Sequence, residues 1–125
     1  MILDTNALSA VADDELSAVK VFKSANSIAL PVIVLGEYRF GILGSRRRAD
    51  YEKWLRDLIS LARVLEIDEQ TSEHYARIRM ELKQGGHPIP SNDLWIAALC
   101  RQHALPLLSR DRHFDWVHDL QRMDW

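Results

Sequence analysis

The chain has 125 residues, of which 47% are hydrophobic and 27% are charged, and its formal net charge is −2. We expect one soluble globular domain over residues 1–125 rather than a disordered chain. The net charge excludes an overall positive potential that would attract nucleic acid. A single cysteine, Cys100, excludes an internal disulfide framework. The sequence contains no long apolar run and no basic leader at its start, so we expect a cytoplasmic protein with no membrane association.

The first half of the chain alternates short apolar runs with helical patterns. Residues 2–3 predict a brief buried strand that ends at Asp4, and helices follow over 6–12 and 14–25, the second capped by Asp13. Residues 27–30 predict a second strand, which Pro31 stops. A helix over 32–43 ends near Gly44, and a stripe of apolar residues at helical spacing predicts another over 47–62.

The second half continues the alternation. A third strand is predicted over 64–67, followed by a helix over 69–84 that Asp68 caps and the pair Gly85-Gly86 stops. Ser91 is expected to cap a helix over 92–103. A fourth strand over 105–108, a short helix over 111–119 and an edge strand over 121–124 complete the chain. This alternation predicts a three-layer α/β/α domain around a central, mainly parallel sheet of about four to five strands.

Four acidic residues follow strands or begin helices of this predicted fold. Asp4 follows the first strand, and Glu37 lies within two helical turns of the second. Asp93 lies in the first turn of its helix, and Asp111 comes directly after the fourth strand. Because the carboxyl ends of parallel strands share one edge of a sheet, we expect these four side chains to converge there.

Taken one at a time, these residues also have ordinary structural explanations. Asp4 fits a turn, Asp93 suits the positive end of a helix dipole, and Asp111 suits a helix cap. Glu37 is harder to explain in this way, because it is in mid-helix and shares a face with Ile33. We expect that face to point toward the core, where an isolated carboxylate is costly.

Several carboxylates in one pocket repel one another, and a bound divalent cation relieves that repulsion. Oxygen ligands without cysteine or histidine favour Mg²⁺ or Mn²⁺ over Zn²⁺. Such ions activate water and stabilise a leaving oxygen, so the pattern predicts hydrolysis of phosphodiesters.

The sequence around these four residues resembles the PIN-domain family, and among its members most closely the bacterial VapC toxins. The resemblance is carried by four motifs that arrive in the family's order and span almost the whole chain. They are Ile2-Leu3-Asp4-Thr5-Asn6, Gly36-Glu37 with Gly41-Ile42, Ile89–Ala98 with its Asp93-x-x-Ile-Ala-Ala core, and Leu107–Phe114 with Ser109-Arg110-Asp111.

The resemblance implies an RNA endonuclease that leaves 5′-phosphate and 3′-hydroxyl ends. It implies that Asp4, Glu37, Asp93 and Asp111 are the catalytic residues and hold one or two Mg²⁺ or Mn²⁺ ions in an acidic groove. Family members are commonly homodimers, and a cognate VapB-like antitoxin silences them by blocking that groove. The resemblance also implies that Thr5, Asn6 and Ser109 support the site through hydrogen bonds. Ser109 stands where the family usually has threonine.

Further residues are candidates for minor roles. Asn92 either aids the site or caps its helix, and Asp115 is a candidate supporting or additional acid. Arg39, Arg110 and Arg112 are candidate RNA contacts, since Arg110 and Arg112 flank Asp111 and Arg39 lies two residues after Glu37. The five histidines show no zinc-site spacing with cysteines. Among them His113, which is near Asp111, either touches substrate or is an ordinary surface histidine, and the surface interpretation is preferred.

Two other functions remain open on the sequence alone. An aspartyl-nucleophile phosphatase also places an aspartate after its first strand, but it needs a second one two residues later, where this chain has Asn6. A non-catalytic PIN-like binding module has the same fold. Such scaffolds usually lose carboxylates, whereas this chain retains all four.

Overall fold

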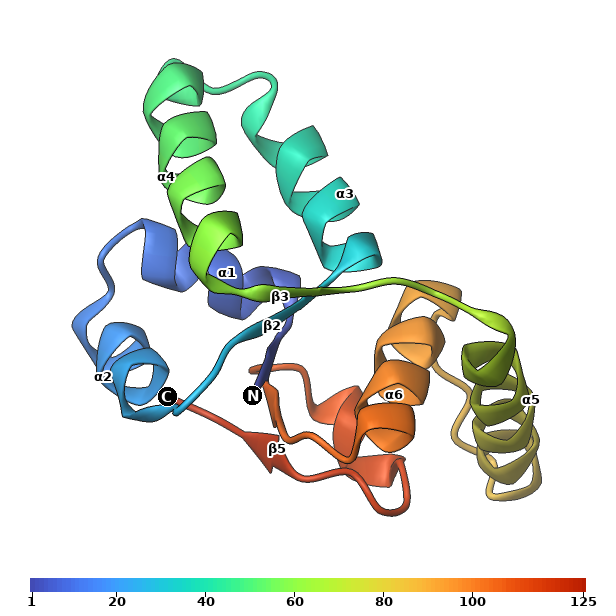
Figure 1. Cartoon of the computed structure of the whole chain (residues 1–125). Helices are drawn as coiled ribbons and strands as arrows, with labels where there is room; N and C mark the ends of the chain where they lie inside the picture. The colour runs from blue at the N-terminus through green and yellow to red at the C-terminus, as the bar shows by residue number, and fades with distance from the viewer.

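In the computed structural model, which describes residues 1–125, a single sheet lies at the centre and helices flank it (Figure 1). The strands are β1 (Ile2–Leu3), β2 (Ala29–Pro31), β3 (Arg63–Leu65), β4 (Leu107–Leu108) and β5 (Arg122–Met123). They lie in the order β3-β2-β1-β4-β5, and every pairing is parallel. The predicted three-layer fold with a mainly parallel sheet is confirmed.

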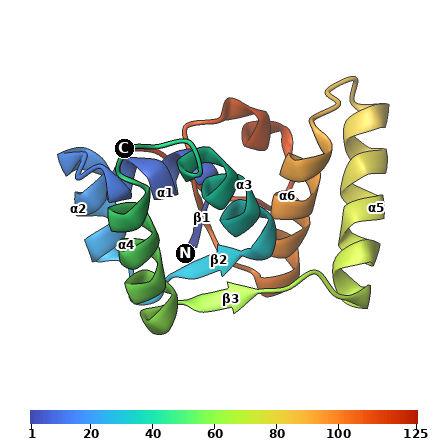
Figure 2. The same ribbon diagram turned by 90° about the horizontal axis from the view of Figure 1, so that it is seen from above.

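Helices cover both sides of this sheet. Both views place α2 and α4 on one side of the molecule and the packed pair α5 and α6 on the other (Figures 1 and 2). The helices are α1 (Thr5–Ala12), α2 (Leu16–Ser24), α3 (Val32–Ile42), α4 (Arg48–Leu61), α5 (Glu69–Gln84) and α6 (Ser91–His103), and a 3₁₀ turn, η1 (Arg112–Trp116), precedes β5. None of these helices is long and apolar enough to cross a lipid bilayer.

The two central strands explain why such short segments hold the sheet together. Ile2 and Leu3 of β1 and Leu107 and Leu108 of β4 are all fully buried. Strands covered by helices on both faces favour a continuous apolar run rather than alternation, which is what both segments have. The amide of Asp4 donates to the carbonyl of Leu108 (3.0 Å), so the ends of β1 and β4 lie side by side.

Three local predictions were wrong and one was confirmed. Asp13 ends α1 instead of capping α2, and the phenolic hydroxyl of Tyr51 donates to its carboxylate, tying α1 to α4. Ser91 is the first residue of α6 and does not cap it, because Pro90, with its φ of −56°, takes the N-cap position. The predicted helix over 111–119 is only the 3₁₀ turn η1. Asp68 does cap α5, in a reciprocal capping box with Thr71.

Candidate active site

Asp4 is the buried centre of the site, with 6% of its surface exposed. One carboxylate oxygen accepts the amide of Thr5 (2.8 Å). The other accepts the hydroxyl of Ser109 (2.6 Å) and the side-chain amide of Asn6 (3.2 Å). These donors fix the carboxylate at the carboxyl end of β1, so the supporting contacts expected from Thr5, Asn6 and Ser109 are present.

Ser109 connects Asp4 to the loop that carries Asp111. Its side chain is fully buried, and its Oγ accepts the backbone amide of Asp111 (3.0 Å) while it donates to Asp4. The carbonyl of the Asn6 side chain accepts the amide of Arg110 (3.3 Å). The two acidic residues, more than a hundred positions apart in sequence, are therefore held by one hydrogen-bond network.

Asp93, Asp111 and His113 form a second group at the same edge. His113 Nδ1 lies 3.2 Å from Asp111 Oδ1 and 3.5 Å from Asp93 Oδ2, and one potential ligand atom from each of the three lies within 4.8 Å of the others. The backbone amide of His113 also donates to Asp111 Oδ1 (2.9 Å).

His113 lies at the surface as interpreted, with its side chain 44% exposed. Its ring also contacts two carboxylates of the site, which the sequence did not predict. The signal that would have found it is its place two residues after Asp111 and directly before Phe114, whose fully buried ring anchors η1.

Glu37 approaches the site from α3 and is exposed. Its predicted place on a core-facing stripe is wrong, because α3 buries Val34, Leu35, Tyr38 and Ile42, which point to a neighbouring face. The carboxylate of Glu37 accepts the hydroxyl of Thr5 (3.2 Å), so Thr5 joins it to Asp4. Glu37 and Thr5 also line a cavity of about 230 Å³ between α1, α3 and α4.

The electrostatics of the site favour a bound cation. Burial, together with the charges of Asp111 and Asp4, raises the pKa of Asp93 to about 6. Burial also raises the pKa of Asp4, although the hydrogen bond from Ser109 opposes the shift. No lysine or arginine forms an ion pair with Asp4, Asp93 or Asp111. The charges of these three carboxylates are therefore not balanced by a lysine or an arginine.

The remaining candidates make their contacts elsewhere. Asp115 binds the guanidinium of Arg122 through both oxygens (2.7 and 3.0 Å) rather than joining the carboxylates. Arg110 pairs with Glu15 (2.7 Å) and lies over the ring of Trp125 (4.3 Å). These contacts show that Asp115 and Arg110 stabilise the C-terminal segment.

Three other candidates are exposed and form no hydrogen bond with Asp4, Asp93 or Asp111, which together are called the acidic group: Asn92, Arg39 and Arg112. Arg39 lies on α3 close to Glu52 of α4, and Arg112 lies close to Asp115. Their exposed side chains leave the proposed RNA contacts of Arg39 and Arg112 as predictions.

Comparison with known proteins agrees with this arrangement. The family model for the PIN domain matches residues 1–120. The chain is 34% identical over 89 residues to ribonuclease VapC5 of Mycobacterium tuberculosis, a match that covers 70% of this chain and 66% of that protein. It is 26% identical over 129 residues to ribonuclease VapC2 of Rickettsia felis, covering 99% and 96%.

A solved structure gives the same result for the fold. The crystal structure of VapBC-5 from Mycobacterium tuberculosis, a member of the VapBC family of toxin–antitoxin systems, contains a chain that superimposes with a TM-score of 0.76 and 27% identity. The superposition covers 99% of this chain and 97% of the other. With its parallel sheet, the acidic residues at the sheet's carboxyl edge and a family match over nearly the whole length, the chain belongs to the PIN domain family.

Proposed function

We propose that this protein is a metal-dependent endoribonuclease and the toxin of a type II toxin–antitoxin pair. The observation that carries the proposal is the meeting of Asp4, Asp93 and Asp111, with His113, at one sheet edge. The names of the relatives VapC5 and VapC2 support ribonuclease activity, and the VapBC-5 complex supports an antitoxin partner.

We further propose that Asp4, Glu37, Asp93 and Asp111 together hold Mg²⁺ or Mn²⁺. The fit rests on the donor set, which is rich in hard oxygen atoms, and on the raised pKa values of Asp4 and Asp93. A bound ion of this kind supplies an activated water and neutralises charge on the phosphate and the leaving oxygen.

The protein's own residues supply position. Ser109, Asn6 and the amide of Thr5 hold the Asp4 carboxylate in one orientation. Thr5 joins this carboxylate to Glu37, because its amide donates to Asp4 and its hydroxyl donates to Glu37. The His113 ring connects Asp111 to Asp93. The result is a preorganised acidic surface at which an RNA phosphodiester is cut by water.

The proposed partners are RNA, a VapB-like antitoxin and a second copy of the chain, with the cytoplasm as the place of action. A homodimer is compatible with α3 and the residue after it, because Val32, Phe40 and Leu43 are large apolar side chains left exposed.

The test compares three proteins induced separately in bacteria: wild type, Asp4→Asn and the matched control Asp50→Asn. Asp50 is an exposed residue of α4 with no side-chain hydrogen bond, so its substitution changes charge equally without touching the site. All RNA 5′-phosphate ends are then sequenced. New ends at discrete sites are expected with wild type and Asp50→Asn and not with Asp4→Asn. Identical end profiles from three soluble proteins would contradict the proposal.

A further inference from the structure

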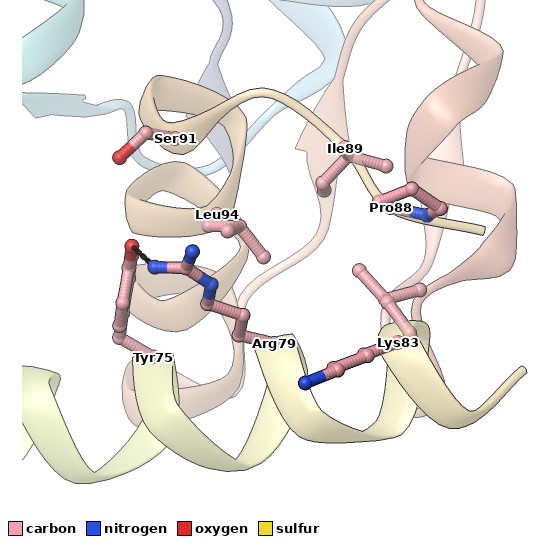
Figure 3. A pocket seen from close by; sticks show the side chains of 8 residues that line it. Tyr75, Arg79, Lys83, Pro88, Ile89, Ser91 and Leu94 are labelled. Atoms are coloured by element: carbon pink, nitrogen blue, oxygen red, sulfur yellow. Dashed lines mark hydrogen bonds between the residues drawn. The ribbon is translucent and has the colours of Figure 1, made fainter. Parts of the chain in front are cut away.

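A second cavity lies between α5, α6 and the segment that joins them, and it has a volume of about 320 Å³. Tyr75, Arg79 and Lys83 line it from α5, and Ser91 lines it from the start of α6 (Figure 3). The three α5 residues are spaced four apart, which places them in a row on one helix face. Neither the acidic group nor Glu37 borders this cavity.

The two cations that face this cavity are unpaired. Neither Arg79 nor Lys83 forms an ion pair with any carboxylate of the chain. The guanidinium of Arg79 instead donates to the hydroxyl of Tyr75 (3.0 Å), which holds it at the cavity (Figure 3). In a chain whose net charge is −2, two unpaired cations in one hollow form a local site for an anion.

The cavity borders the first turn of α6, which also carries Asp93. Ser91 begins this helix without a side-chain cap at the preceding position, so the first backbone N–H groups of α6 have no capping acceptor. Such N–H groups add to the attraction that Arg79 and Lys83 exert on an anion. Asp93, two residues after Ser91, belongs to the acidic group. The cavity and the acidic residue Asp93 therefore both border the first turn of α6.

An independent feature on the same connecting segment points to a nucleotide. His87 stacks on Trp116 with ring centroids 4.4 Å apart, and Pro88, the next residue, lines the cavity. Trp116 is 47% exposed and lies 6.0 Å from the ring of His113. Proteins bind single-stranded RNA with aromatic rings and cations, and here the stacked ring of His87 comes one residue before Pro88 of the cavity.

We propose that the cavity between α5 and α6 binds a phosphate of the substrate RNA next to the cleaved bond, through Arg79 and Lys83. This inference rests on the proposed ribonuclease function. It assigns the cavity as the place to which the substrate strand passes from the acidic group. It assigns Arg79 and Lys83 the role of positioning the RNA, whereas Arg110, the arginine beside Asp111, is occupied by Glu15 and Trp125.

The test measures RNA binding rather than cleavage. The probe is a fluorescein-labelled single-stranded RNA of twelve random nucleotides, and all proteins carry Asp4→Asn so that the probe stays intact. The test variant is Arg79→Ala/Lys83→Ala. The control is Arg77→Ala/Lys53→Ala, which removes the same charge from exposed positions of α5 and α4 outside the cavity. Circular dichroism confirms folding, and affinity is measured by anisotropy over a range of salt concentrations.

The test variant is expected to bind about tenfold more weakly than the control at low salt. The slope of its log affinity against log salt concentration should be less steep by about one. Equal affinity and equal slope in the two variants would overturn the inference while leaving the proposed function intact. Unchanged RNA binding with weakened binding of a polyglutamate peptide would instead assign the cavity to a protein carboxylate. An absence of RNA binding by every variant, with no cleavage by wild type, would refute both proposals.

Discussion

Asp93 makes stability depend on pH in a direction opposite to that of most acidic residues. Burial raises its pKa from an ordinary 3.8 to about 6, so between these values the folded protein binds more protons than the unfolded chain. The contribution of Asp93 to stability is therefore most favourable below pH 4 and becomes unfavourable as the pH rises through 6.

Asp93→Asn should relieve this effect. Without added metal, the variant is expected to be more stable than wild type by about 1–3 kcal/mol above pH 6.5, with the difference shrinking toward zero near pH 3.5. Urea unfolding at a series of pH values, in the presence of a chelator, measures this difference. The exposed control Asp50→Asn should show no such trend. A difference that grows toward acidic pH would refute the assignment.

His113 is the residue whose importance became visible only in three dimensions. Its ring touches Asp111 and Asp93, so removing the ring takes one contact from each carboxylate. His113→Ala is expected to weaken Mn²⁺ binding by about tenfold, which is the usual effect of losing a group that orients metal ligands. Isothermal titration calorimetry measures the affinity, and His118→Ala, at a side chain 84% exposed, is the control. Equal affinities would show that the ring contributes nothing to cation binding.

Among the elements, α5 depends on a buried threonine. Thr71 is fully buried; its hydroxyl accepts the amide of Asp68, completing the capping box, and contacts the side chain of Gln102 on α6. Thr71→Val keeps the shape and removes these bonds, so it should lower the free energy of unfolding by about 1–2 kcal/mol. Ser72→Ala, at an exposed position in the same turn, should change it far less. Chemical denaturation of both variants provides the comparison.

The elements also show where sequence reasoning succeeds. Apolar periodicity and Pro or Gly punctuation located every strand and every α-helix, because these signals act over a few neighbouring residues. The caps at Asp13 and Ser91 were predicted wrongly, since the choice between adjacent polar residues depends on the path of the chain. Asp13 serves Tyr51, a partner 38 residues away, and no local pattern indicates that contact.

The same limit applies to the candidate site. The expected convergence of Asp4, Asp93 and Asp111 followed from the topology of a parallel sheet, which is a property of strand order alone. The prediction that Glu37 lies on the core-facing side of its helix was wrong. The reason is that α3 is apolar on more than one side, with Val32 and Phe40 exposed. The contact of His113 with Asp93 and Asp111 was not predicted, because η1 turns more tightly than the helix expected there.

At the scale of the whole molecule, Arg122 fastens the last strand to the site. Its side chain, 13% exposed, binds Asp115 and Asp124 and donates to the backbone carbonyl of Ser109 (2.9 Å). Arg122→Ala is therefore expected to lower the free energy of unfolding by about 2 kcal/mol and to reduce cleavage at elevated temperature. Arg122→Lys keeps the charge but not the forked geometry, so its free energy of unfolding should lie between those of wild type and Arg122→Ala. Thermal unfolding followed by circular dichroism ranks the three; equal midpoints would contradict the role.

The central strand β1 begins at the second residue of the chain, and one of its two partners, β4, ends at Leu108. Asp4 consequently has neither its hydrogen-bond partner Ser109 nor its companion Asp111 until the ribosome has translated the chain as far as residue 111. A nascent chain shorter than this lacks the assembled group of Asp4, Asp93 and Asp111, whatever part of it has already folded.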